Sequence, residues 1–255
     1  MKILKNITVF TMVMLLSVST VLEAREKNIS NFSSSASNLV DSTGTFDGNK
    51  IYADVANNGL FLDYHVSGDS ALEWPKGTGV HSIFQSALWM GATVNGSIRT
   101  IVGDYTQDMG PGPWGGDPLA AVHRIYKVEK SMLASPLDFA DFQEWPVEFG
   151  APWVDVDGDG VYTPLPGGTD HPEFLGDQVL WFVSNDGDPA YKLNFGTSPM
   201  NVEIQTTMFG FDRPDVFGDM VFLKQLVINK GSDDLVDTYM GLWSDPDLGY
   251  AGDDF

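Results

Sequence analysis

Short segments of alternating apolar and polar residues recur along this chain of 255 residues, and they constrain its fold more than any other feature. Successive side chains of a β-strand point to opposite faces of a sheet, so a period of two indicates a strand with one buried face. Segments 60–66, 201–209 and 236–243 follow this pattern. Segment 201–209 has on one face Val202, Ile204, Thr206 and Met208, and on the other Glu203, Gln205 and Thr207.

In segment 60–66, the same pattern predicts an apolar face of Leu60, Leu62, Tyr64 and Val66 and a polar face with Asp63 and His65. Segments 179–183 and 220–228 are apolar on both faces, which predicts central strands.

Turn sequences such as Asn57-Asn58-Gly59 and Asn95-Gly96 separate these expected strands. One short helix is expected from Ser135-Pro136 to Gln143, with its inner side formed by Leu137, Phe139 and Ala140. The sequence therefore predicts an all-β protein, an antiparallel β-sandwich of the jelly-roll or immunoglobulin-like kind with few short helices.

The N-terminus has the order of a secretory signal. Lys2 and Lys5 precede an apolar run over 7–22, and Ala24 supplies a small residue for cleavage. The run is shorter than the roughly 20 residues that a membrane span needs. We therefore expect a signal peptide at 1–24, residence outside the cell or on its surface, and no membrane insertion after cleavage. The alternative is a retained membrane anchor.

Composition divides the remaining chain. Residues 25–48 are rich in Ser and Asn and predict a linker. A weak boundary near 145–150 separates a first β region at 49–146 from a second at 147–255, and the two can be subdomains of one sandwich.

Charge and cysteine content exclude several classes of function. With 35 acidic against 14 basic residues, the chain has a formal charge of −21, which argues against binding nucleic acid or an anionic membrane. The absence of cysteine rules out disulfides, thiolate metal sites and cysteine nucleophiles. An exported chain of this kind must be stabilised by its core or by metal ions.

The strongest local signal is the acidic loop 155–162, DVDGDGVY. Asp155, Asp157 and Asp159 alternate before glycine, as in loops that fold around calcium, and Val161 is placed to offer its carbonyl. The twelfth position is proline instead of glutamate, so the closing carboxylate must come from elsewhere. The nearest candidates are Asp170, Glu173 and Asp177, and we take Asp177 into the predicted ligand set. The alternative is a solvated acidic turn.

Other motifs give weaker evidence of function. The acidic segment 245–254 is a weaker candidate for a second ion, and Gly110–Gly115 matches a dinucleotide pattern by accident, because its two prolines forbid the required helix. It predicts a rigid surface loop with an exposed Trp114. The four histidines are too dispersed for ligand spacing. We identify no catalytic residue, although a pair of carboxylates that meets in space remains an alternative.

Segments 59–92, 148–164, 176–188 and 221–254 resemble the N-terminal region of large, poorly characterised bacterial secreted proteins, many of which carry a C-terminal sorting domain for type IX secretion. The resemblance implies export, cell-surface residence and β-rich modules. It does not extend to a sorting domain, and the chain stops at Phe255 inside an acidic cluster, so we expect a fragment of a longer protein with downstream domains.

The sequence thus predicts a secreted or cell-surface β module that calcium stabilises, with a structural, adhesive or glycan-binding role. Its expected partners are polysaccharide or other surface proteins. The alternative is the N-terminal part of a secreted carbohydrate-active hydrolase.

Overall fold

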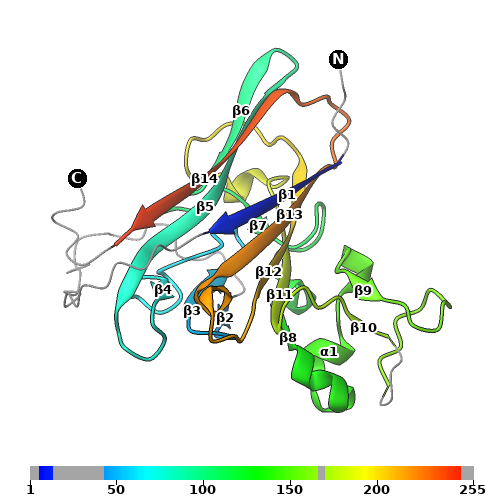
Figure 1. Ribbon diagram of the computed structural model, residues 1–255. Helices are drawn as coiled ribbons and strands as arrows, with labels where there is room; N and C mark the ends of the chain where they lie inside the picture. The colour runs from blue at the N-terminus through cyan, green and yellow to red at the C-terminus, as the bar shows by residue number, and fades with distance from the viewer. Residues whose placement is uncertain (1–5, 14–42, 166–169, 248–255) are drawn as a thin grey trace.

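The strands of the described residues form two antiparallel sheets of six strands each and one two-stranded ribbon (Figure 1). The computed structural model describes residues 6–13, 43–165 and 170–247. The first sheet, called sheet A, has the order β1-β13-β12-β11-β7, with β8 also paired to β11. Its strands are β1 (Asn6–Val13), β7 (Gly110–Pro111), β8 (Tyr126–Glu129), β11 (Gln178–Asn185), β12 (Val202–Gly210) and β13 (Val221–Asn229).

The second sheet, called sheet B, has the order β14-β5-β4-β3-β2, with β6 also paired to β5. It is built around β5, the longest of these strands, which forms a hairpin with β6 and pairs with β14 over most of its length. The strands are β2 (Thr43–Phe46), β3 (Tyr52–Ala56), β4 (Leu72–Glu73), β5 (His81–Val94), β6 (Ser97–Val102) and β14 (Val236–Pro246).

The main core lies between the two sheets. One part joins β2, β3 and β4 to the middle of sheet A and includes Phe46, Leu72, Leu180 and Leu223. The other part joins β5 and β6 to β12 and β13 and includes Met90, Ile101, Ile204 and Val227. This face-to-face packing confirms the predicted sandwich.

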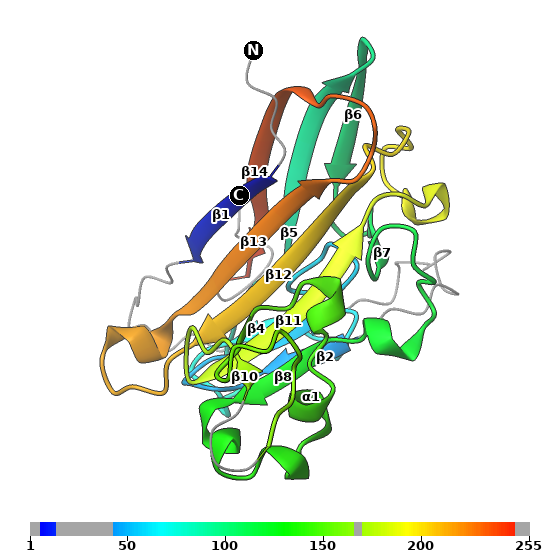
Figure 2. The same cartoon turned by 90° about the vertical axis from the view of Figure 1, so that its right-hand side faces the viewer.

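A third layer covers the other face of sheet A (Figure 2). It contains α1 (Ala140–Gln143) and a two-stranded ribbon of β9 (Trp153–Val154) and β10 (His171–Pro172). Its buried aromatic residues, Phe142 and Trp145, pack on Trp181 of β11. The short 3₁₀ helices of the chain span Ala121–His123, Lys130–Ala134, Pro136–Asp138, Val147–Phe149, Pro189–Tyr191 and Val216–Asp219.

The third layer and the loop that carries Trp114 together cover the polar face of β12. The alternation over 201–209 predicts a half-buried strand, but almost every residue of β12 is buried. Glu203 is 1% exposed and is held by the backbone N–H of Trp114 and by Lys230, whose Nζ lies 3.1 Å from its Oε1. The strand prediction is confirmed, and the predicted solvent face is wrong.

The predicted strand at 60–66 is also wrong. Only Leu62 forms a β-bridge, to Ser86, and the chain then turns. Asp63 is 3% exposed, and its Oδ1 accepts from the backbone N–H of His65. The side chain of Asp63 thus satisfies a backbone donor locally and favours a turn over a strand.

The predicted helix over 135–143 is broken into the 3₁₀ helix Pro136–Asp138 and the single turn α1. Leu137, Phe139 and Ala140 are exposed, and the residues that pack inward are Pro136 and Phe142. The assignment of the inner side was therefore wrong, because it assumed one continuous helix, and the helix is interrupted after Asp138.

Two described strands lie within the predicted N-terminal segments. β1 lies inside the predicted signal peptide and pairs with β13 over eight residues. β2 lies inside the predicted linker, and its Phe46 is fully buried. The remaining linker residues, 25–42, lie outside the described residues. An apolar strand such as β1 satisfies the backbone groups along the edge of β13.

The regions 49–146 and 147–255 share both sheets. Sheet A takes β7 and β8 from the first region and three strands from the second, whereas β14 of the second region joins sheet B. The two regions are therefore joined within one sandwich. Within the described part of the chain, every helix falls short of the length and apolarity needed to cross a bilayer.

Candidate cation site and polar pocket

The acidic loop connects the two strands of the β9–β10 ribbon. Trp153 stands edge-on to the ring of Tyr162, with centroids 5.6 Å apart. The hydroxyl of Tyr162 donates to the backbone oxygen of Phe142 at 2.6 Å, which ties the loop to the third layer. Burial, and secondarily the charge of Asp170, raise the pKa of Tyr162, so this phenol stays a donor at ordinary pH.

Asp155 organises the first half of the loop. Its Oδ1 accepts from the N–H of Gly158 at 2.7 Å, and its Oδ2 accepts from the N–H of Gly160 at 3.0 Å. Both glycines have a left-handed backbone, with φ of 79° and 76°, which side-chain-bearing residues rarely adopt. The glycines therefore allow the loop to curl around the Asp155 carboxylate.

Asp157 and Asp159 each form a local turn, in which the side chain accepts from the backbone N–H two residues later. Oδ1 of Asp157 accepts from the N–H of Asp159 at 3.2 Å, and Oδ1 of Asp159 accepts from the N–H of Val161 at 2.7 Å. Each of these bonds uses one carboxylate oxygen of its residue, so lone pairs on both side chains remain for another partner.

A fourth carboxylate completes the group. Asp155, Asp157, Asp159 and Asp170 each place an oxygen within 4.8 Å of the others. Asp170 is 1% exposed and accepts from the N–H groups of Val156 at 2.9 Å and Thr163 at 2.7 Å. Three exposed carboxylates and one buried carboxylate thus converge at one point.

The structure brings together Asp155, Asp157 and Asp159 as predicted, but it places Asp177 elsewhere. Asp170 directly precedes β10, and the pairing of β10 with β9 returns it to the start of the loop. Asp177 directly precedes β11, and its Oδ2 accepts from the N–H of Asp212 at 3.0 Å. Among the three nearest candidates, Asp170 is the one that closes the group. The carbonyl of Val161 accepts from the Thr163 hydroxyl at 3.3 Å, and its role as a ligand stays a prediction.

Four carboxylates this close repel one another unless a cation or protons offset their charge. Oxygen atoms alone make up the group, and such donor sets suit hard cations like calcium and magnesium. The irregular loop and the mixture of exposed and buried ligands fit calcium better, because magnesium demands a nearly ideal octahedron.

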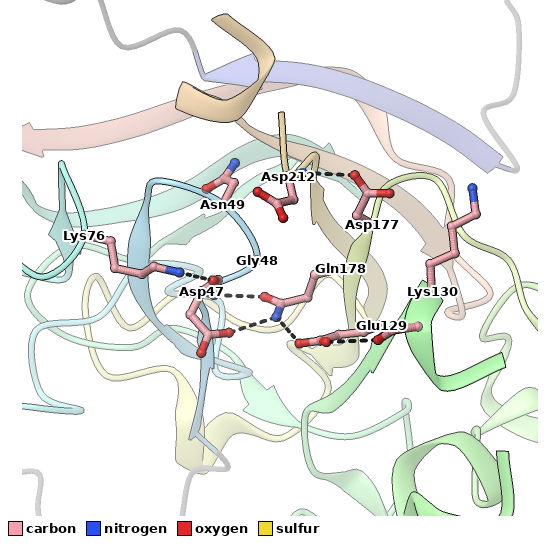
Figure 3. Close-up of a pocket in the computed structure, with 10 residues that line it drawn as sticks. Asp47, Gly48, Asn49, Lys76, Glu129, Lys130, Asp177, Gln178 and Asp212 are labelled. Atoms are coloured by element: carbon pink, nitrogen blue, oxygen red, sulfur yellow. Dashed lines mark hydrogen bonds between the residues drawn. The ribbon is translucent and has the colours of Figure 1, made fainter. Parts of the chain in front are cut away.

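A separate polar pocket of about 560 Å³ opens where β2, β8 and β11 meet (Figure 3). Gln178 lies at its centre, between Asp47 and Glu129. Its Nε2 donates to Asp47 Oδ1 at 2.8 Å and to Glu129 Oε1 at 2.9 Å, and its Oε1 accepts from the Asp47 N–H. The pocket is also lined by Lys76, Lys130, Asp177 and Asp212.

The charge state of Asp47 follows from these neighbours. Burial opposes its ionisation, but hydrogen bonds from Lys127 and Gln178 outweigh burial and hold its pKa below the ordinary value of 3.8. Asp47 is therefore ionised at neutral pH. Asp47 and Gln178 are 131 residues apart, so no local sequence pattern indicated this pocket.

Trp114 lies on the loop expected from the Gly-Pro pattern and is 43% exposed. It lines a second pocket of about 340 Å³ together with Tyr191.

The acidic segment 245–254 was the weaker candidate for a second ion. Among the described residues, Asp245 and Asp247 belong to no group of three or more possible metal ligands. Asp245 accepts from the Tyr105 hydroxyl, and Asp247 accepts from the Ser70 hydroxyl. Residues 248–254 lie outside the described residues.

Two of the four histidines lie outside the described strands. His65 lies in a turn, and His123 lies in a 3₁₀ helix and is 7% exposed. The ring of His123 bonds to the backbone oxygen of Asp117 at 2.7 Å, which gives it a local structural role.

No family model, curated protein or solved structure matches this chain.

Proposed function

We propose that this chain is an exported β-sandwich module that binds calcium through Asp155, Asp157, Asp159 and Asp170, and that it has a structural, adhesive or glycan-binding role outside the cell or on its surface. The observation that carries the proposal is the convergence of these four carboxylates within 4.8 Å. Calcium takes six to eight oxygen ligands, so backbone oxygens such as that of Val161 and water complete the shell.

Calcium at this loop stabilises the fold by linkage. The loop is bonded to the third layer through Tyr162 and Phe142, so unfolding of this layer disperses the ligands. A ligand that binds only the folded state stabilises it by about 1.4 kcal/mol when its concentration is about ten times its Kd. A Kd of about 10⁻⁴–10⁻³ M is typical of extracellular modules and lets millimolar calcium act in this way.

The order of charged and apolar residues in 1–24 supports export. Because the chain has no cysteine, bound ions can stabilise its loops in place of disulfides. An acidic chain of this kind suits a hydrated, uncharged partner better than an anionic one.

Thermal unfolding tests the calcium proposal. We expect millimolar calcium chloride to raise Tm by about 3 to 6 °C above sodium chloride of equal ionic strength. Asp157→Asn keeps the acceptor for the Asp159 N–H but removes a ligand charge, so it should abolish the shift. Asp138→Asn, an equal charge change at an exposed site outside the loop, should keep it. An equal Tm in both salts for the wild type would show that no stabilising ion binds.

The alternative, a carbohydrate hydrolase, has one supporting observation in the polar pocket. Asp47 Oδ1 and Glu129 Oε1 bond to the same nitrogen and so lie at most about 5.7 Å apart, near the 5–5.5 Å between the carboxyl groups of retaining glycosidases. Release of reducing ends from a neutral polysaccharide by the wild type, lost in Glu129→Gln, would favour this alternative. Equal release by both proteins would exclude this pair.

A further inference from the structure

Four aromatic side chains gather on one side of the β14–β5 pair and its neighbouring loop. They are Trp89 of β5, Tyr239 and Trp243 of β14, and Tyr105, which follows β6; together they are called the aromatic face. Tyr239 is 77% exposed, Tyr105 43% and Trp89 37%, whereas the aromatic residues of the cores are buried. So much exposed aromatic area on one side of a sheet marks a binding surface.

The strand register leaves open space beside these rings. Antiparallel pairing sets Trp89 opposite Gly241 and Tyr239 opposite Gly91, so each ring has a glycine as its cross-strand partner. A methyl group added at Gly241 would meet no atom of the described residues within 4 Å, and at Gly91 the nearest atom would be 3.9 Å away. The glycines therefore form an open floor next to the rings.

The rings are held in place before any ligand arrives. The indole N–H of Trp89 donates to the backbone oxygen of Gly103 at 2.6 Å. The planes of Trp89 and Trp243 are within 5° of parallel, with centroids 6.2 Å apart, and Tyr105 stands edge-on to Trp243 at 5.5 Å. A surface fixed in this way loses little conformational entropy on binding.

A carboxylate borders the rings. The hydroxyl of Tyr105 donates to Oδ2 of Asp245 at 2.9 Å. Burial, followed by this hydrogen bond, raises the pKa of Tyr105 to about 12, so the phenol remains the donor and Asp245 the acceptor. This bond fixes the ring of Tyr105 beside Trp243.

We propose that the aromatic face binds a neutral polysaccharide, with pyranose rings lying on Trp89 and Trp243 over the floor of Gly241 and Gly91. A pyranose presents an apolar face of C–H groups, whose weakly positive hydrogens are attracted to the negative face of an indole. An uncharged ligand also avoids the repulsion that a chain with a formal charge of −21 exerts on polyanions. This assignment rests on the proposed glycan-binding role and names its surface.

Affinity electrophoresis in gels that contain one soluble neutral polysaccharide each, namely hydroxyethylcellulose, xylan, galactomannan or laminarin, tests the proposal. We expect at least one to retard the wild type, and Trp89→Ala and Tyr239→Ala to weaken binding about tenfold. Trp114→Ala is the matched control, because Trp114 is similarly exposed but lies on the loop after β7. Retardation by none of the four, or equal retardation of Trp89→Ala and wild type, would overturn the proposal.

Gly241→Val separates loss of binding from loss of folding. Its side chain enters open space on a strand, where valine is favoured, so the thermal stability should be kept or raised. Valine would nevertheless fill the floor, and we expect retardation to fall about tenfold. Unchanged retardation of a folded Gly241→Val would contradict the assigned floor. Binding of polylysine in place of the polysaccharides would assign the face to a cationic polypeptide instead.

The calcium shift of Tm is measured on the same proteins. If the shift persists without retardation by any polysaccharide, the surface assignment fails and the calcium site stands. If the shift is absent while retardation persists and depends on Trp89, the calcium site fails and the surface assignment stands.

Discussion

Lys192 and Asp108 form an ion pair inside the protein: Nζ lies 2.9 Å from Oδ2, and both side chains are at most 2% exposed. Asp186 is 4.0 Å from the same Nζ and is fully buried. Lys192 also donates to the backbone oxygen of Thr100 in β6. One cation thus joins the segment after β11 to sheet B and offsets two buried carboxylates.

We expect Lys192→Met to lower the free energy of unfolding by about 3 to 5 kcal/mol, because it leaves Asp108 and Asp186 buried without their cation. Urea denaturation measures this loss. The exposed pair of Arg213 and Asp215 provides the control, and Arg213→Met should cost less than about 1 kcal/mol. Similar losses for the two variants would show that the buried ion pair contributes no more to stability than the exposed pair.

Asp219 should make stability depend on pH in the acid range. Burial raises its pKa, but hydrogen bonds from Lys50 Nζ at 2.9 Å and Trp74 Nε1 at 3.0 Å outweigh burial and hold it below 3.8. The depressed pKa contributes stability that is present above the unfolded value of 3.8 and is lost as the pH falls through the folded value.

The stability difference between wild type and Asp219→Asn should therefore be constant near neutral pH and shrink as the pH falls below about 4. Urea denaturation of both proteins over this range measures it. A difference that stays constant down to strongly acidic pH would show that the Lys50 and Trp74 contacts do not favour the ionised carboxylate.

β1 lies within the predicted signal peptide, so cleavage would free the edge of β13. In an antiparallel strand, successive amides point alternately to the two neighbours. In a chain that begins at residue 25, we expect hydrogen exchange to accelerate at those β13 amides that face β1, while amides that face β12 stay protected. Equal protection of both sets in the shortened chain would show that the β1 pairing does not protect them.

Local patterns predicted the parts of the fold that depend on local chemistry. β12 and β14 were found by alternation, and the turn Asn95-Gly96 joins β5 to β6 with φ of 50° and 79°, as a two-residue hairpin requires. Local patterns failed where contacts between distant segments determine which residues are buried. The polar face of β12 is buried by a layer that no strand pattern announces.

The candidate cation site was also predicted only in part. Asp155, Asp157 and Asp159 lie in one loop, so their spacing alone brought them together. The fourth carboxylate depends on the pairing of β9 with β10, which the sequence did not reveal, and Asp170 therefore replaces Asp177. The aromatic face was missed for a similar reason: its residues come from three distant segments that meet only through the β5–β14 register.

Calorimetric titration of the wild type with calcium is the most direct test of the calcium site. We expect one calcium ion per chain at the acidic loop with a Kd of about 10⁻⁴–10⁻³ M, loss of this binding in Asp157→Asn, and retention in Asp138→Asn. Absence of binding in the wild type, or the same binding in Asp157→Asn, would contradict a calcium site formed by Asp155, Asp157, Asp159 and Asp170.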